Sequence, residues 1–96
     1  MKTIHYSTQA KKDLKKYRSN VQLMTALFDV LDKLKKGEII PSKYKPHELI
    51  GTYKDCMECH ICSDFLLIWI DVVSDMVEIV RIGSHSELFG KKKEKR

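Results

Sequence analysis

The sequence has no apolar stretch that approaches the roughly 18 to 20 residues needed to cross a membrane, because its longest apolar run covers only residues 65–70. The first residues also lack the apolar segment of a secretory signal. Cysteine is scarce and odd in number, at three residues, which is typical of reduced thiols rather than of a disulfide framework. We therefore expect a cytoplasmic protein with no membrane partner.

Proline and glycine are also few, with two and four residues in a chain of 96, and no internal repeat is visible. The hydrophobic fraction of 43% is enough for one modest core and argues against disorder. We expect a single domain over residues 1–90, followed by a basic, charged tail over residues 91–96.

The net charge of +5 indicates affinity for a polyanion, since Lys and Arg displace counterions from phosphates. Charge alone does not separate a nucleic-acid-binding protein from the many basic proteins that bind no anion.

Two amphipathic helices are predicted in the N-terminal half, after a short strand over residues 3–6. Ser7 or Thr8 can cap the first helix, in which an apolar stripe faces the core and lysines face solvent or a partner. Asn20 can cap the second helix, and Gly37 is placed to end it.

The C-terminal half predicts strands over residues 59–63, 65–73 and 76–82, the last two joined by a hairpin at residues 74 and 75. Residues 38–52 contain two prolines and a glycine and predict a loop. The sequence from Ser84 to Glu87 matches a capping box, so a short helical turn should begin there and end by Gly90. This order predicts an α+β fold, with an antiparallel sheet covered on one face by two helices.

Several side chains in this half can carry acid–base chemistry. The alternation of a strand places Glu58, His60, Cys62 and Asp64 on one side, where an imidazole and a carboxylate could act together. Arg81 should point away from Val80 and Ile82; it could face a polyanion or pair with Glu58 or Asp64.

Residues near the C-terminus have two interpretations each. His85 lies at a capped helix start, which attracts phosphate, but it could also be an exposed histidine beside a cap. Phe89 could stack on a nucleobase or fix the last turn to the core.

The cysteines at positions 56, 59 and 62 have the spacing C-x-x-C-x-x-C, which suggests a zinc or iron–sulfur site with His60. A strand would direct Cys59 and Cys62 to opposite faces, so we interpret them as ordinary small residues.

Four segments together resemble the YafQ-type toxins of the RelE/ParE superfamily. They are residues 44–51 (YKPHELIG), 58–60 (ECH), 64–68 (DFLLI) and 81–90 (RIGSHSELFG). The resemblance implies a twisted antiparallel sheet, a cognate antitoxin that covers the toxin, and cleavage of mRNA on the ribosome. It implies contact with operator DNA only through the antitoxin complex. Matched by position, the family's functional residues are His47, His60, Asp64, Arg81, His85 and Phe89.

The implied chemistry requires no metal and no cofactor. His85 is expected to be the acid, either Asp64 or His60 the base, Arg81 the cation that stabilises the phosphorane, and His47 a supporting group. Three alternatives are a catalytically inactive homologue, a ParE-like toxin that acts on DNA gyrase, and a small metal-binding regulator built on the cysteines. The combination of His60, Asp64 and His85 favours the nuclease.

Overall fold

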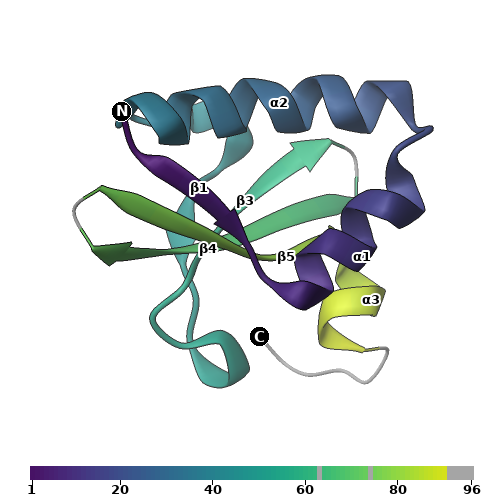
Figure 1. Ribbon diagram of the computed structural model, residues 1–96. Coiled ribbons are helices and arrows are strands. Elements are labelled where there is room, and N and C mark those ends of the chain that lie inside the picture. The colour runs from purple at the N-terminus through teal and green to yellow at the C-terminus, as the bar shows by residue number, and fades with distance from the viewer. Residues whose placement is uncertain (63, 74, 91–96) are drawn as a thin grey trace.

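The computed structural model describes residues 1–62, 64–73 and 75–90, which form a five-stranded sheet with three α-helices (Figure 1). The elements are β1 (Thr3–Tyr6), α1 (Thr8–Tyr17), α2 (Val21–Lys36), β2 (His47–Glu48), β3 (Met57–Cys62), β4 (Phe65–Val73), β5 (Met76–Ser84) and α3 (His85–Phe89). Two 3-10 helices, η1 (Ser42–Tyr44) and η2 (Gly51–Tyr53), lie between α2 and β3. The α+β class is confirmed, while the expected tail at 91–96 lies outside the described residues.

The sheet has the order β1-β5-β4-β3-β2. Strands β2 to β5 pair antiparallel, but β1 pairs parallel to β5, so the sheet is mixed rather than wholly antiparallel as expected. β1 and β5 lie far apart in the sequence and are not joined by a tight turn. A hairpin would force two strands to run antiparallel, and this pair is free of that constraint. β2 lies in the segment predicted as a loop.

The helix ends agree with the sequence. The Ser7 hydroxyl accepts from the Ala10 amide at 3.0 Å, and Asn20 Oδ1 accepts from the Leu23 amide at 3.1 Å. Gly37 ends α2 with a φ of 72°, a left-handed conformation that glycine adopts without steric cost. None of the described helices is long and apolar enough to cross a membrane.

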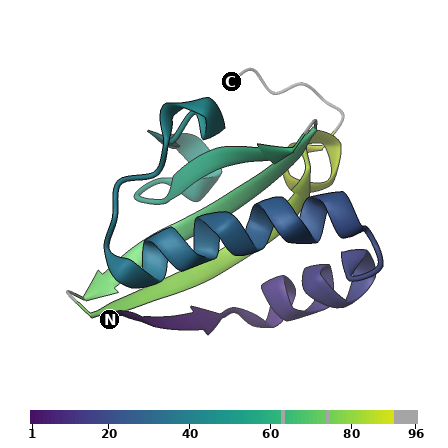
Figure 2. The ribbon, with the colours of Figure 1, turned by 90° about the horizontal axis from the view of Figure 1, so that it is seen from above.

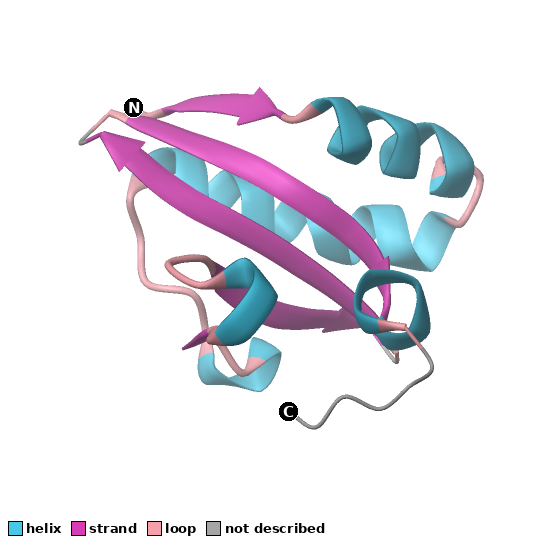
Figure 3. Ribbon diagram, turned by 90° about the horizontal axis from the view of Figure 1, so that it is seen from below, coloured by secondary structure: helices cyan, strands magenta, loops and turns pink. Residues whose placement is uncertain are grey.

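Helix α2 lies over one face of the sheet, with α1 beside it along the edge of β5 (Figure 2). The main core fills this helix-covered face and includes Leu23, Leu27, Leu67, Trp69 and Ile79. We call the opposite side the open face; α3 and η2 lie there (Figure 3), whereas η1 packs against α2 through Tyr44. The apolar cluster of the open face is smaller, with buried residues Cys56, Leu66, Ile68 and Leu88.

Irregular pairing changes which face the side chains occupy. Ile68 pairs with Arg81 but Trp69 pairs with Ile79, so Val80 is an extra residue in β5. As a result Ile82 lies with Ile79 in the main core, and Arg81 lies beside its strand partner Ile68 on the open face. Strict alternation predicts instead that Ile79 and Ile82 lie on different faces. A similar shift between His60 and Cys62 packs Cys62 against the main core.

Candidate active site on the open face

A cavity of about 320 Å³ on the open face brings together three of the four histidines. We call it the histidine cavity. β2 supplies His47, β3 supplies His60, and the start of α3 supplies His85, so distant segments of the chain meet here. The full lining is His47, Glu48, Leu49, Ile50, Glu58, His60, His85 and Phe89.

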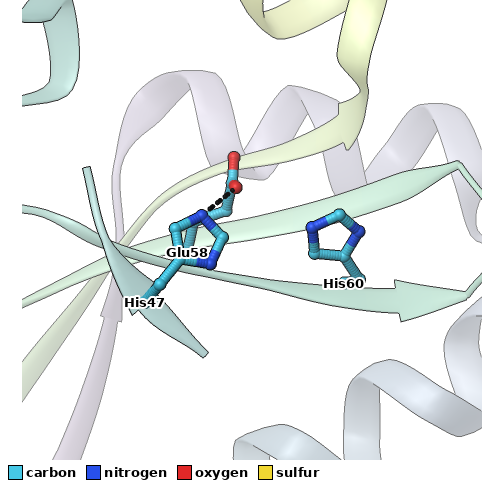
Figure 4. A group of neighbouring side chains, drawn as sticks. All are labelled: His47, Glu58 and His60. Atoms are coloured by element: carbon cyan, nitrogen blue, oxygen red, sulfur yellow. Dashed lines mark ion pairs between the residues drawn. The ribbon is translucent and has the colours of Figure 1, made fainter. Parts of the chain in front are cut away.

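His47 and Glu58 form an ion pair in the lining of the cavity (Figure 4). Glu58 is only 3% exposed, and its Oε1 lies 2.9 Å from His47 Nε2. The other ring nitrogen, Nδ1, lies 2.8 Å from the carbonyl oxygen of Lys45. Since a carbonyl can only accept, His47 donates through Nδ1, and one proton must lie between Nε2 and Glu58. This arrangement fixes the orientation of the His47 ring.

His60 lies between the other two imidazoles, with ring centres 6.0 Å from His47 and 5.9 Å from His85. Burial lowers the pKa of His60, and the positive charges of His47, His85 and Lys45 lower it further against the opposing effect of Glu58. His60 is therefore held as a neutral imidazole near neutral pH, the form that a general base requires.

The capping box that begins α3 holds His85 in place. The Ser84 hydroxyl accepts from the Glu87 amide at 3.3 Å, and Glu87 accepts from the Ser84 amide at 3.0 Å. Lys16 and Tyr17 of α1 also donate to Glu87, and these contacts, led by Lys16, lower the pKa of its carboxyl to about 2. The short helix is thereby attached to α1.

Asp64 and Phe89 flank His85. Asp64 lies in the turn after β3 rather than in the strand, and its Oδ1 is 3.5 Å from His85 Nδ1. The Phe89 ring is 6.0 Å from His85 and packs edge-on against Tyr53 at 5.5 Å. Phe89 thus both packs on the smaller apolar cluster and forms a wall of the histidine cavity.

Arg81 pairs with neither of the carboxylates considered from the sequence. Its Nε and Nη2 donate to Asp13 of α1 at 2.9 and 3.1 Å, and Asp13 also accepts from the Ile82 amide at 2.9 Å. These contacts raise the pKa of Arg81 and keep the guanidinium charged. Arg81 is not a wall of the histidine cavity; it lies near Tyr53, which in turn contacts Phe89.

The cysteines do not form the metal site considered from their spacing. Cys59 is fully buried in the main core, whereas Cys56 belongs to the cluster on the open face. Burial, assisted by the Glu58 charge, raises the pKa of the Cys59 thiol to about 12. The structure therefore supports their interpretation as small core residues.

Two polar residues were missed as members of the site. Strand alternation places Glu58 on the same side as His60, but the sequence does not predict its contact with His47. Asp13 was overlooked among lysines, yet it lies three residues from Ala10 and four from Tyr17, on the buried stripe of α1. Its position on this stripe is the feature of the sequence that indicates a buried, paired carboxylate.

Comparison with known proteins identifies the family. Residues 2–90 match the family described as the bacterial toxin of the type II toxin-antitoxin system, YafQ. The chain belongs to the YafQ family. It is 31% identical over 88 residues to the mRNA interferase toxin YafQ of Escherichia coli K12, covering 91% of this chain and 95% of that protein.

Solved structures of bacterial toxins agree with this fold. A metal-bound toxin from Helicobacter pylori is 39% identical with a TM-score of 0.81, covering 93% of this chain and all of that one. The toxin in the E. coli DinJ-YafQ toxin-antitoxin complex is 30% identical with a TM-score of 0.78, covering 93% and 98% of the two chains. The expected membership of the YafQ branch is confirmed.

Proposed function

We propose that this chain is an mRNA interferase, an endoribonuclease toxin that stops translation by cutting mRNA on the ribosome. The observation that carries the proposal is the meeting of His47, His60 and His85 around one open cavity, with the carboxylates of Glu58 and Asp64 in contact with two of them. The E. coli relative bears the name mRNA interferase toxin, which favours this activity over action on DNA gyrase.

His60 is the general base in this proposal, because its lowered pKa leaves it neutral. It takes the proton from the 2′-hydroxyl of the target nucleotide, and the 2′-oxygen then attacks the adjacent phosphorus. The bond from phosphorus to the 5′-oxygen breaks as His85 gives that oxygen a proton. The products are a 2′,3′-cyclic phosphate and a 5′-hydroxyl.

The remaining site residues support this transfer. Asp64 contacts His85 Nδ1 at 3.5 Å and orients its ring, and the His47–Glu58 pair fixes one wall of the cavity. Arg81, held by Asp13 through Nε and Nη2, presents its remaining N–H groups to the developing phosphorane charge. Phe89 provides an aromatic surface on which a base can stack.

The cavity is open and small, so in this proposal the ribosome orients the RNA. Correct alignment is worth roughly 7 to 11 kcal/mol in favourable intramolecular reactions. By likeness to the DinJ-YafQ complex, a cognate antitoxin blocks this site. The chain then acts in the cytoplasm, where its target mRNA is translated.

A single-turnover assay tests the proposal, using one message free and bound to programmed ribosomes. Cleavage should be many times faster on the ribosome and should stop when the scissile nucleotide carries a 2′-deoxyribose. Cleavage of the 2′-deoxy message at the normal rate would contradict the 2′-hydroxyl mechanism. Equal rates with and without ribosomes would show that the chain orients RNA by itself.

Metal binding is a second candidate property of the same cavity. One ligand atom each from His47, Glu58 and His60 lies within 4.8 Å of the others, and Glu58 Oε2 has no hydrogen-bond partner among the described residues. Two imidazoles and a carboxylate suit zinc or copper, and the H. pylori relative is described as metal-bound. Such an ion would occupy the base His60 and therefore inhibit cleavage. Calorimetric titration with zinc tests this by comparing the zinc affinity of the parent with that of Glu58→Gln, which should be weaker. Equal affinities would exclude His47, Glu58 and His60 as the zinc site.

A further inference from the structure

A second cavity, of about 490 Å³, lies next to the histidine cavity between α2, η1 and the end of β3. We call it the lysine pocket. Its lining consists of Ala26, Lys43, Tyr44, Lys45, His60, Ile61 and Cys62. We propose that the lysine pocket is a phosphate subsite, which binds the RNA phosphodiester next to the one that is cut. This inference rests on the proposed function and extends it to the path of the RNA.

The charges around the lysine pocket favour an anion. Lys43 and Lys45 supply two ammonium groups, and none of the described residues that line the pocket is a carboxylate. Two carboxylates lie behind its walls. Asp29 of α2 accepts from the Tyr44 hydroxyl at 2.7 Å and interacts with the charge of Lys43, and Glu58 interacts with the charge of His60. Asp29 is already paired with Lys33, and Glu58 with His47, so these carboxylates do not cancel the charge of the two lysines that line the pocket.

The two lysines are held by the structure. Lys43 Nζ lies 5.1 Å from the centre of the Tyr44 ring, and Tyr44 is itself buried and fixed to Asp29. Lys45 has a φ of 51°, a left-handed conformation that residues with a side chain seldom adopt. Its carbonyl contacts His47 Nδ1 at 2.8 Å. Only the backbone carbonyl of Lys45 contacts the histidine site, and a change of its side chain keeps that carbonyl.

His60 connects the two cavities, because it lines both of them. An RNA chain whose scissile phosphate lies between His60 and His85 continues past His60 toward Lys45. RNA carries a phosphate at every nucleotide, and an adjacent phosphodiester therefore matches the charge of the pocket. Ala26 of α2 also lines the pocket, and its small side chain leaves room for the RNA backbone.

The test is a double-mutant cycle between the lysines and the RNA. A ribosome-bound message is prepared with a neutral methylphosphonate at the phosphate on the 5′ side of the cleavage site, and another with it on the 3′ side. Single-turnover cleavage at increasing toxin concentration, at pH 7.5, gives the half-saturating concentration and the maximal rate for the parent and for Lys43→Gln/Lys45→Gln. Lys11→Gln/Lys12→Gln on α1 is the control with the same change in charge.

The lysine-pocket variant should raise the half-saturating concentration about tenfold and leave the maximal rate within about threefold. One of the two methylphosphonates should weaken the parent and the control by a similar factor, yet have no further effect on the lysine-pocket variant. Independent effects at both positions would overturn the proposal and leave the pocket as a contact for ribosomal RNA or an acidic antitoxin segment. Failure of the parent to cut any message would instead refute the proposed function.

Discussion

The two faces of the sheet are built from different kinds of contact. The helix-covered face holds the main core, in which Leu23, Leu27 and Leu67 are fully buried. The open face has a smaller apolar cluster and carries His47, His60, His85, Glu58 and Arg81 around it. One face therefore supplies most of the burial that stabilises the fold, and the other holds polar groups whose arrangement matters more than their number.

This difference means that stability and cleavage can be changed separately. Burial on the helix-covered face follows from the apolar periodicity of the sequence, and the stabilisation that it provides scales with the apolar area buried. The open face depends on a few directed contacts, such as the His47–Glu58 pair and the Asp13–Arg81 fork. Changes on each face should affect different measurements.

The largest effect on stability should come from Leu27→Ala in the main core. Leu27 is fully buried, and its truncation leaves a cavity, which should lower the free energy of unfolding by about 2 to 5 kcal/mol. Urea unfolding measures this, with Ile50→Ala, at a position that is 85% exposed, as the control. A loss below about 1 kcal/mol would mean that the helix-covered face is not the main source of stability.

A smaller but specific effect is expected from Arg81→Lys. Asp13 occupies Nε and Nη2 of Arg81, so the guanidinium can still donate to phosphate, whereas a lysine must choose between the two anions. The maximal cleavage rate should fall about tenfold to a hundredfold with little change in stability. Arg18→Lys, at the exposed end of α1, is the matched control. A normal rate would show that only charge is needed at position 81.

The smallest effect concerns Glu87 and pH. Its pKa is lowered to about 2 in the folded chain, so its contribution to stability is present above the unfolded value of 4.5 and is lost as pH falls from 4.5 toward 2. Glu87→Gln keeps a capping side chain but removes the charge. The variant should be less stable than the parent by under about 1 kcal/mol near neutral pH, and the difference should shrink below pH 4.5. Thermal unfolding across this range checks the trend; a constant difference would contradict it.

Local features of the fold could be predicted because their causes are local. Asn20, Gly37 and the Ser84–Glu87 capping box mark helix ends through contacts a few residues long. The grouping of His47, His60 and His85 came from the family resemblance, and the structure shows the three rings around one cavity.

The features of the fold and the site that the sequence does not predict depend on contacts between distant residues. The extra residue at Val80 breaks strict alternation, which is why Ile82 and Arg81 lie on faces other than those predicted. The parallel pairing of β1 with β5 and the contact of Asp13 with Arg81 each join residues about 70 positions apart. A pattern read along the chain does not contain this information.

The division of roles between the two faces is tested most directly by His85→Ala, with His5→Ala at an exposed position of β1 as the matched control. Each protein is assayed for single-turnover cleavage of a ribosome-bound message and for its free energy of unfolding. Loss of the acid should reduce the cleavage rate of His85→Ala by about 10² to 10⁴, with unfolding within about 0.5 kcal/mol of the parent. His5→Ala should match the parent in both. Cleavage by His85→Ala at the parental rate, or a loss of cleavage that is explained by unfolding, would contradict a catalytic site on the open face.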